Sequence, residues 1–449
     1  MFVRDREFYK KVLTIAVPIT LQSLITFAIN MMDTVMVGKL GEIPLSAASL
    51  SGQIFFITTI LCFGIGGGGS VLTSQFWGKK DKESISKTLS IILKLNIIVG
   101  VIFLALSLFI PDKLLMFYTD DINVIRAGVP YLKLVSIMYP LFCITTGISV
   151  IFRTVSQIKI SVIANSVAFV LNVFFNWIFI FGKFGAPALG LSGAAIGTVI
   201  ARVVECSIMV GYLFFIDKKI NFTFKSLLGF DKEIFKKYIK TGINVLISDA
   251  ILVAGLTSLT MILGRLGPEM IAANSICSIV IQLSTIMIAG IGSSGLVIIG
   301  NTVGEGKIKL AREQAKTFLL ISIITGIISA LIIVLAKPIA IDFYSVSDET
   351  KHIAYQLMNG AAFIIIFQVP SIVLTKGILR GGGDTKFLLY ADVTFLWVLS
   401  IPLGILAAFV FKFPPALIYI CLKFDEIIKS IWCAIRMMGH KWIKDVTVG

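Results

Sequence analysis

The stretch FGIGGGGSV, residues 63–71, decides the fold because a second copy of it, AGIGSSGLV, lies at residues 289–297. The two copies are 226 residues apart, and other parts of the chain match at the same offset. These matches are VGKLGEIPLSAAS at 37–49 with LGRLGPEMIAANS at 263–275, Gly78 with Gly304, Gly100 with Gly326 and, after a one-residue slip, Arg153 with Arg380. The sequence therefore contains an internal duplication, and its two halves are expected to share one fold.

The composition predicts a membrane protein. Of the 449 residues, 57% are hydrophobic and only 14% are charged, and the mean hydropathy is +0.96. Soluble domains are about 45–50% apolar and about 25% charged. Apolar runs recur along the chain that are long enough to cross a hydrocarbon core of about 30 Å as helices. We therefore expect an all-α polytopic membrane protein.

Twelve transmembrane helices are predicted, and the charged residues lie in the short breaks between them. The first apolar run is too long for a signal peptide and has no small-x-small cleavage site, so it is interpreted as the first span. The predicted spans are 12–37, 46–76, 88–110, 125–152, 160–181, 192–216, 238–263, 270–301, 317–336, 352–378, 388–411 and 415–434.

The net charge of +15 reflects the orientation of the chain in the membrane. Of its 40 lysines and arginines, 25 lie in the two tails and in alternate loops. Such a bias marks the cytoplasmic side, so both termini are expected in the cytoplasm. No basic segment is interleaved with aromatic residues, so no nucleic-acid partner is expected.

The repeat predicts two lobes of six helices. An even number of spans gives both copies the same orientation, so their pseudo-two-fold axis runs along the membrane normal. The lobes are predicted at 1–216 and 238–449, joined by a cytoplasmic linker at 217–237. A duplicated channel or membrane enzyme is an alternative, but the sequence has no TVGYG, HExxH or Gly-x-Ser-x-Gly motif. The protein is therefore not expected to be an enzyme. The six cysteines lie in apolar segments and form no CxxC pair, so neither a disulfide framework nor a metal site is expected.

The glycine-rich stretch has two interpretations. It lacks the flanking pattern of a phosphate loop, and it lies inside an apolar span rather than in a polar linker. Glycines in a span allow close helix packing. The functional alternative is a bend point, and the candidate hinge is Gly67 with Gly68, which meet serines in the second copy.

Four polar residues of the first lobe are predicted to share one depth in the membrane. Asp33 lies near the outer end of the first span, Asn172 and Asn176 are one helical turn apart on the fifth, and Thr198 is on the sixth. A carboxylate, two amides and a hydroxyl would suit a proton or a sodium ion. The alternative is that the amides and the hydroxyl only tie helices together.

Other ionisable residues within spans have weaker interpretations. Arg202 and Glu205 are three residues apart and are expected to form an ion pair. Asp249, with Gln282 and Gln368, is a candidate polar site in the second lobe. Asp392 is expected at the membrane interface and partly wet. The remaining group is expected to reach toward water or to line an inner mouth: Lys94, Lys133, Lys423, Asp425, Glu426 and Lys429.

Several of these segments resemble the multidrug and toxic compound extrusion (MATE) transporters. The resemblance rests on NMMDTVMVGKLGEIPLSAASL, the glycines of the second span, LNVFFNWIFIFGKFGAPALGLSGAAIGT and GILRGGGDTK, and it covers nearly the whole chain. It is closer to the prokaryotic group related to DNA-damage-inducible transporters. It implies a twelve-helix antiporter that expels substrates in exchange for protons or sodium ions.

The resemblance also implies roles for individual residues. Asp33 stands where the family has its first-span acid, and Asn172 and Thr198 match its polar partners. Asn176 departs from the pattern, because that group often has an aspartate there. Vibrio-type members carry second-lobe carboxylates at two positions that are filled here by Leu252 and Val369.

The expected function is a secondary active antiporter in the cytoplasmic (inner) membrane of a prokaryote. It would export amphipathic, often cationic, organic compounds by alternating access, as a monomer with no cofactor beyond the coupling H⁺ or Na⁺. The partners are then the lipid bilayer and small organic substrates. The alternatives are a flippase for lipid-linked oligosaccharides and an uncoupled channel.

Overall fold

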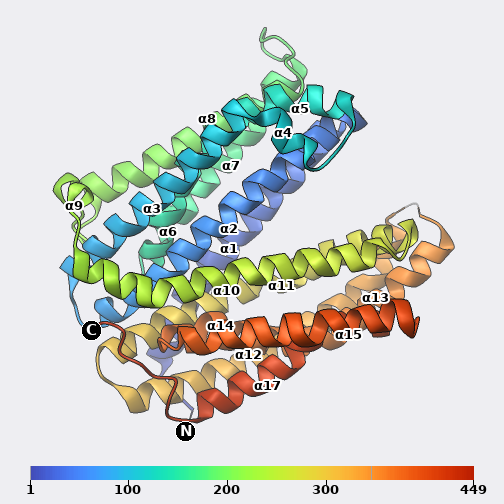
Figure 1. The fold of residues 1–449 in the computed structure, drawn as a ribbon. Helices are drawn as coiled ribbons and strands as arrows, with labels where there is room; N and C mark the ends of the chain where they lie inside the picture. Colours follow the sequence, from blue (N-terminus) through green and yellow to red (C-terminus); the bar gives the residue numbers. More distant parts are fainter. Residues whose placement is uncertain (1, 345, 449) are drawn as a thin grey trace. The chain divides into compact units, whose positions relative to one another are not determined.

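The computed structural model describes residues 2–344 and 346–448, and it contains helices but no strand in these ranges (Figure 1). The helices of the first half are α1 (Arg6–Gly38), α2 (Glu42–Gly78), α3 (Lys82–Phe109), α4 (Pro111–Met116), α5 (Ile122–Val135), α6 (Met138–Thr154), α7 (Ile158–Phe181), α8 (Leu191–Gly211), η1 (Tyr212–Ile216) and α9 (Phe224–Leu228). Those of the second half are α10 (Lys232–Gly264), α11 (Pro268–Gly304), α12 (Ile308–Asp342), α13 (Asp348–Ile372), η2 (Val373–Leu379), α14 (Thr385–Val393), η3 (Thr394–Ser400), α15 (Ile401–Ile405), η4 (Leu406–Val410), α16 (Pro415–Leu422) and α17 (Phe424–Met438).

The predicted all-α polytopic fold is confirmed, with a difference in the number of continuous spans. Ten helices of the described chain are long and apolar enough to cross a membrane, or eleven if α5 and α6, which bend by 49°, form one span. The predicted twelfth span is divided into α16 and α17, which have 8 and 15 residues and meet at Lys423. The division falls at Lys423, and three more charged residues follow it within α17, namely Asp425, Glu426 and Lys429.

The described chain divides into two compact units. The first unit consists of Leu21–Thr73 and Asp81–Ile239, and the second unit consists of Met1–Thr20, Ser74–Lys80 and Lys240–Gly449. Helices α1, α2 and α10 each contribute residues to both units.

Within the second unit, the ends of α2 and α11 cross through glycines. A Cβ atom at Gly78 would overlap the carbonyl oxygen of Asn301, and one at Gly304 would overlap that of Gln75. Under the 226-residue offset, Gly78 corresponds to Gly304 and Gln75 to Asn301, so the contact is self-complementary. Only glycine permits such an approach of two backbones, which explains why both copies carry it here.

The C-terminal tail is held against this crossing. The Gln75 amide donates to the carbonyl oxygens of Gly381 and Lys444 at 3.3 and 3.0 Å, and its oxygen accepts from the Val446 N–H at 2.9 Å. The fully buried Asp384 accepts ion-pair hydrogen bonds from Arg436 at 2.8 Å and Lys444 at 2.5 Å. These bonds fix the turn before α14 and the tail in one arrangement.

Helix α2 passes through the glycine-rich stretch without interruption. A Cβ atom at Gly66 would lie 3.1 Å from the Val150 side chain of α6, and one at Gly69 would overlap Ile92 of α3. Both contacts lie in the first unit, and they support the packing interpretation for these two glycines. The hinge at Gly67 and Gly68 stays a prediction, because this conformation shows no bend there.

The glycine crossing predicts a strong effect of one methyl group. Gly304→Ala is expected to destabilise the protein by about 1–3 kcal/mol, because the added Cβ would force two helix backbones apart. Thermal unfolding of the purified protein in detergent measures this effect. Gly52→Ala is the matched control, because no atom lies within 4 Å of its added Cβ. An equal melting temperature for Gly304→Ala and the wild-type protein would contradict the close crossing.

Candidate functional site

A cavity of about 470 Å³ lies inside the first unit. Residues of α1, α2, α5, α6, α7 and α8 line it, and its wall includes Phe55, Tyr131, Met138 and Tyr139. Among the described residues that line it, Asp33 is the only carboxylate and Arg202 is the only strong base. The cavity is therefore largely apolar and aromatic, with one acid and one base in its wall.

The four polar residues predicted to share one depth are joined by hydrogen bonds. Asn176 Nδ2 donates to Asp33 Oδ1 at 2.7 Å and contacts Asn172 Oδ1 at 3.4 Å. Asn172 Nδ2 in turn donates to the Thr198 hydroxyl at 3.2 Å. Asn176 is fully buried and Asn172 is 3% exposed, so the amides lie within the protein behind the Asp33 carboxylate, which lines the cavity. The chain of bonds leads from the carboxylate in the cavity to the hydroxyl on α8.

Close packing of α7 on α8 fixes this group. Helix α8 begins with the pattern Gly-x-x-x-Gly at Gly193 and Gly197, which allows another helix to approach closely. A Cβ atom at Gly193 would overlap the Phe179 carbonyl oxygen, and one at Gly197 would overlap Asn176 Oδ1. The Asn176 oxygen accepts no hydrogen bond within the described chain, so its position is set by packing on Gly197.

The predicted pair of Arg202 and Glu205 is confirmed. The guanidinium Nη1 lies 2.6 Å from Glu205 Oε2, and the Arg202 side chain is only 15% exposed. The guanidinium also lies 5.4 Å from the centre of the Phe142 ring. The ion-pair partner of Arg202 is therefore Glu205, and no ion pair joins Arg202 to Asp33 within the described residues.

In the second unit, Asp249 has a basic partner that the sequence reading missed. Arg380 Nη2 donates to Asp249 Oδ1 at 3.0 Å, and both side chains are largely buried. The repeat links this pair to a second one, because the corresponding residues of the first unit are also bonded. There, Arg153 Nη2 donates to Gln22 Oε1 at 2.9 Å. Both residues of that pair precede their counterparts by 227 positions.

The other two members of the second-lobe candidate lie apart from Asp249. Gln282 is exposed, and Gln368 is half-buried. Within residues 2–344 and 346–448, no ion pair or side-chain hydrogen bond joins either glutamine to Asp249.

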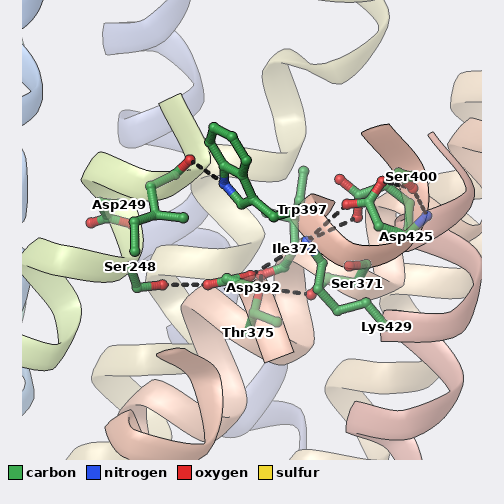
Figure 2. A network of polar contacts seen from close by, with 12 residues as sticks. Ser248, Asp249, Ser371, Ile372, Thr375, Asp392, Trp397, Ser400, Asp425 and Lys429 are labelled. Atoms are coloured by element: carbon green, nitrogen blue, oxygen red, sulfur yellow. Dashed lines mark hydrogen bonds and ion pairs between the residues drawn. The ribbon is translucent and has the colours of Figure 1, made fainter. Parts of the chain in front are cut away.

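The expectation is wrong for Asp392 and for three charged residues of the last span, whereas Lys423 is half-buried. Asp392, Asp425 and Lys429 are 3–4% exposed, and Glu426 is 8% exposed. Figure 2 shows the side chains of Asp392, Asp425 and Lys429 together. The Ser248 hydroxyl donates to Asp392, and the Ser400 hydroxyl donates to Asp425. Their burial follows from the packing of α10, α14 and α17, which the position of each residue in its own span does not reveal.

The MatE family model matches residues 18–178 and again residues 245–406, which is more than two thirds of the chain. This chain belongs to the MatE family. The two matches begin 227 residues apart, next to the 226-residue offset of the repeat. This chain is also similar to the probable multidrug resistance protein NorM of Pasteurella multocida, with 23% identity over 88% of this chain and 85% of the relative. The probable multidrug resistance protein NorM of Idiomarina loihiensis is 26% identical over 90% of this chain and 87% of that relative.

The solved structures agree with the fold. A MATE transporter in a bent conformation matches with a TM-score of 0.87 over 96% of both chains at 17% identity. A MATE transporter in a straight conformation matches with a TM-score of 0.86, over 98% of this chain and 99% of the other, also at 17% identity. The chain is therefore a membrane-spanning transporter of the MATE type and not an enzyme.

The geometry predicts that Gly197 positions the site. Gly197→Ala should displace Asn176 and remove its hydrogen bond to Asp33. This hydrogen bond stabilises only the charged form of Asp33, and a hydrogen bond to a charged group contributes about 1.5–3 kcal/mol, so a coupling proton should bind about tenfold or more tightly in the variant. The measurement is transport by proteoliposomes as a function of ion concentration. Gly211→Ala in the same helix is the control, because its added Cβ has no neighbour within 4 Å. Identical ion dependence in both variants would count against this positioning.

Proposed function

We propose that this MATE transporter is a secondary active antiporter that exports amphipathic, often cationic, organic compounds in exchange for H⁺ or Na⁺. The observation that carries the proposal is the position of Asp33, the only carboxylate among the described residues of the cavity wall. It is held by an amide that donates to it. An isolated acid within a membrane span is costly and usually functional.

The chemistry of Asp33 supports competition between ion and substrate. In its charged form the carboxylate attracts a cation, and the Asn176 amide stabilises that charge. A proton or a sodium ion neutralises it and removes the attraction. A cationic substrate would then be held when the ion is absent and released when the ion binds, which is the linkage that an antiporter needs. A membrane potential contributes about 2.3 kcal/mol per charge per 100 mV to such exchange.

The cavity wall supports the substrate class. Ligand sites of drug size occupy about 300–1,000 Å³ and are lined mainly by apolar and aromatic side chains. Phe55, Tyr131 and Tyr139 belong to this wall, and aromatic rings attract organic cations. The related proteins named for multidrug resistance agree with a broad range of such compounds.

The proposed location is the cytoplasmic membrane of a prokaryote, with both termini on the cytoplasmic side. The excess of lysine and arginine in the tails and alternate loops supports the orientation. Alternating access is the proposed transport cycle. The bent and straight conformations of similar MATE structures support a change of conformation during it.

Asp33→Asn is the direct test of coupling. The asparagine has nearly the same shape, but it carries no negative charge and cannot take up a proton. Ion-driven transport should therefore fall to the level of empty liposomes. Purified protein in liposomes, a panel of fluorescent cations, and separately imposed proton and sodium gradients provide the measurement. The response of the wild-type protein to each gradient identifies the coupling ion.

Asp112→Asn serves as the matched control, because this exposed carboxylate in α4 lies outside the cavity. Undiminished ion-driven transport by Asp33→Asn would falsify the role of Asp33. Downhill transport by the wild-type protein that ignores both gradients would indicate an uncoupled channel. Saturable binding of an anionic polyprenyl lipid would favour the flippase.

The hinge has a separate test. Replacing Gly67 and Gly68 together with alanine should slow transport. Alanine favours the helical conformation by about 0.5–1 kcal/mol per residue relative to glycine, so the helix should bend less readily at these positions. The initial rate of export from proteoliposomes measures the effect, and the melting temperature shows whether folding is intact. Unchanged turnover would leave only the packing interpretation of the stretch.

A further inference from the structure

A buried cluster of charges lies in the second unit and shares no residue with the proposed coupling site. Lys429 Nζ lies 3.4 Å from Asp392 Oδ1, 3.5 Å from Asp425 Oδ2 and 3.7 Å from Glu426 Oε2 (Figure 2). All four residues are at least nine-tenths buried. Three carboxylates thus surround one ammonium group.

The cluster has more acidic groups than basic ones. If all four groups are ionised, the net charge is that of two uncompensated carboxylates. The neighbouring titratable groups are Tyr419 on α16, Lys423 between the two helices and Cys433 on α17, and Asp384 lies near Cys433.

The neighbouring helices do not correct this imbalance. Even with Lys423 included, the carboxylates outnumber the cations, and α10 and η3 contribute the hydroxyls of Ser248 and Ser400. Asp249 on α10 is already paired with Arg380. Uncompensated charge in a protein interior is costly by several kcal/mol per ion.

Hydrogen-bond donors are also missing from the cluster. Asp392 Oδ1 and Glu426 Oε2 are buried and accept no hydrogen bond within the described chain. Their distances to Lys429 exceed the 2.7–2.9 Å that is typical of a charge-assisted hydrogen bond. The hydroxyl of Ser371, which is fully buried, lies beside the Glu426 carboxylate but makes no hydrogen bond of normal geometry. A polar side chain that is buried without a partner indicates that a donor is absent from the site.

A proton would supply both the charge and the donor. Bound to Glu426 Oε2, it would remove one negative charge and create an O–H group that can donate to Ser371 Oγ. A metal ion is disfavoured, because the described residues contain no group of three acidic, histidine or cysteine side chains placed to hold one. The charge of Lys429 would still balance one of the two remaining carboxylates.

We infer that the cluster of Asp392, Asp425, Glu426 and Lys429 is a second proton-binding site, with Glu426 as the group that takes up the proton. The inference does not depend on the role proposed for Asp33, because the groups of the two sites belong to different units. It adds to the transporter a titratable group that could carry a further proton per cycle.

The test is infrared difference spectroscopy of the purified protein, titrated from about pH 8 to about pH 6, a range in which ordinary carboxyl groups stay almost fully ionised. The experiment uses Asp33→Asn protein, so that any carboxylic-acid C=O band comes from another group. We expect a band in this protein, and we expect Glu426→Gln to abolish it. Glu83→Gln, which changes an exposed carboxylate of α3, should leave the band unchanged.

Ser371→Ala keeps the inference testable if Glu426→Gln does not fold. Loss of the hydroxyl should retain the band and move it to higher frequency, because the protonated carboxyl loses a hydrogen-bond partner. Absence of the band in Asp33→Asn protein, or its persistence in Glu426→Gln, would overturn the assignment. A band that disappears on adding sodium chloride at constant pH, but not choline chloride, would show that the cluster binds sodium instead. Failure of the Asp33 transport test would leave these spectra unaffected.

Discussion

The crossing of α2 and α11 is the contact on which the arrangement of the second unit depends. Lipid chains are as apolar as leucine, so helices in a membrane gain little from hydrophobic burial against one another, and close packing of small residues contributes more. Gly78 and Gly304 bring the two backbones so near that no side chain fits at either position. The same crossing presents Gln75, whose amide holds the turn at Gly381 and the C-terminal tail. The glycines of the repeat therefore determine the positions of segments that contain no repeat glycine themselves.

A second constraint is that each polar group in an apolar interior needs a partner. The related positions of the two units satisfy it differently. Arg153 is held by the neutral Gln22, whereas Arg380 is held by the charged Asp249. The duplicated backbone has thus kept the geometry of the pair while its charge has diverged. As a result, the first unit has one acid in its cavity wall, Asp33, which is bonded to an amide and not to a base. The second unit has a buried cluster in which three carboxylates surround Lys429.

The sequence predicted those features that depend on one helix or on the repeat. The apolar runs predicted most of the spans, and the i, i+4 spacing of Asn172 and Asn176 predicted a polar face on α7. The bonds of Asn176 to Asp33 and of Asn172 to Thr198 followed from their common depth in the membrane.

The features that the sequence missed depend on which helices meet. Burial of Asp392 and Lys429 requires α10, α14 and α17 to pack together, and nothing in the spacing along one helix reveals that. The division at Lys423 was missed for a related reason. A hydropathy average smooths over the charged residues that separate α16 from α17.

Asn176 shows how one neutral group can set the charge of a site. An aspartate at this position would bring a second carboxylate close to Asp33, and two carboxylates that are so close tend to share one proton. The amide donates a hydrogen bond instead, so Asp33 can accept it in its charged form without a proton. Its oxygen packs on Gly197, which leaves the amide little freedom to turn and offer an acceptor. The cavity wall therefore presents a single group that can bind one proton or one sodium ion. Exchange of more than one charge in a cycle would need a further ionisable group, and the second unit contains acids in excess.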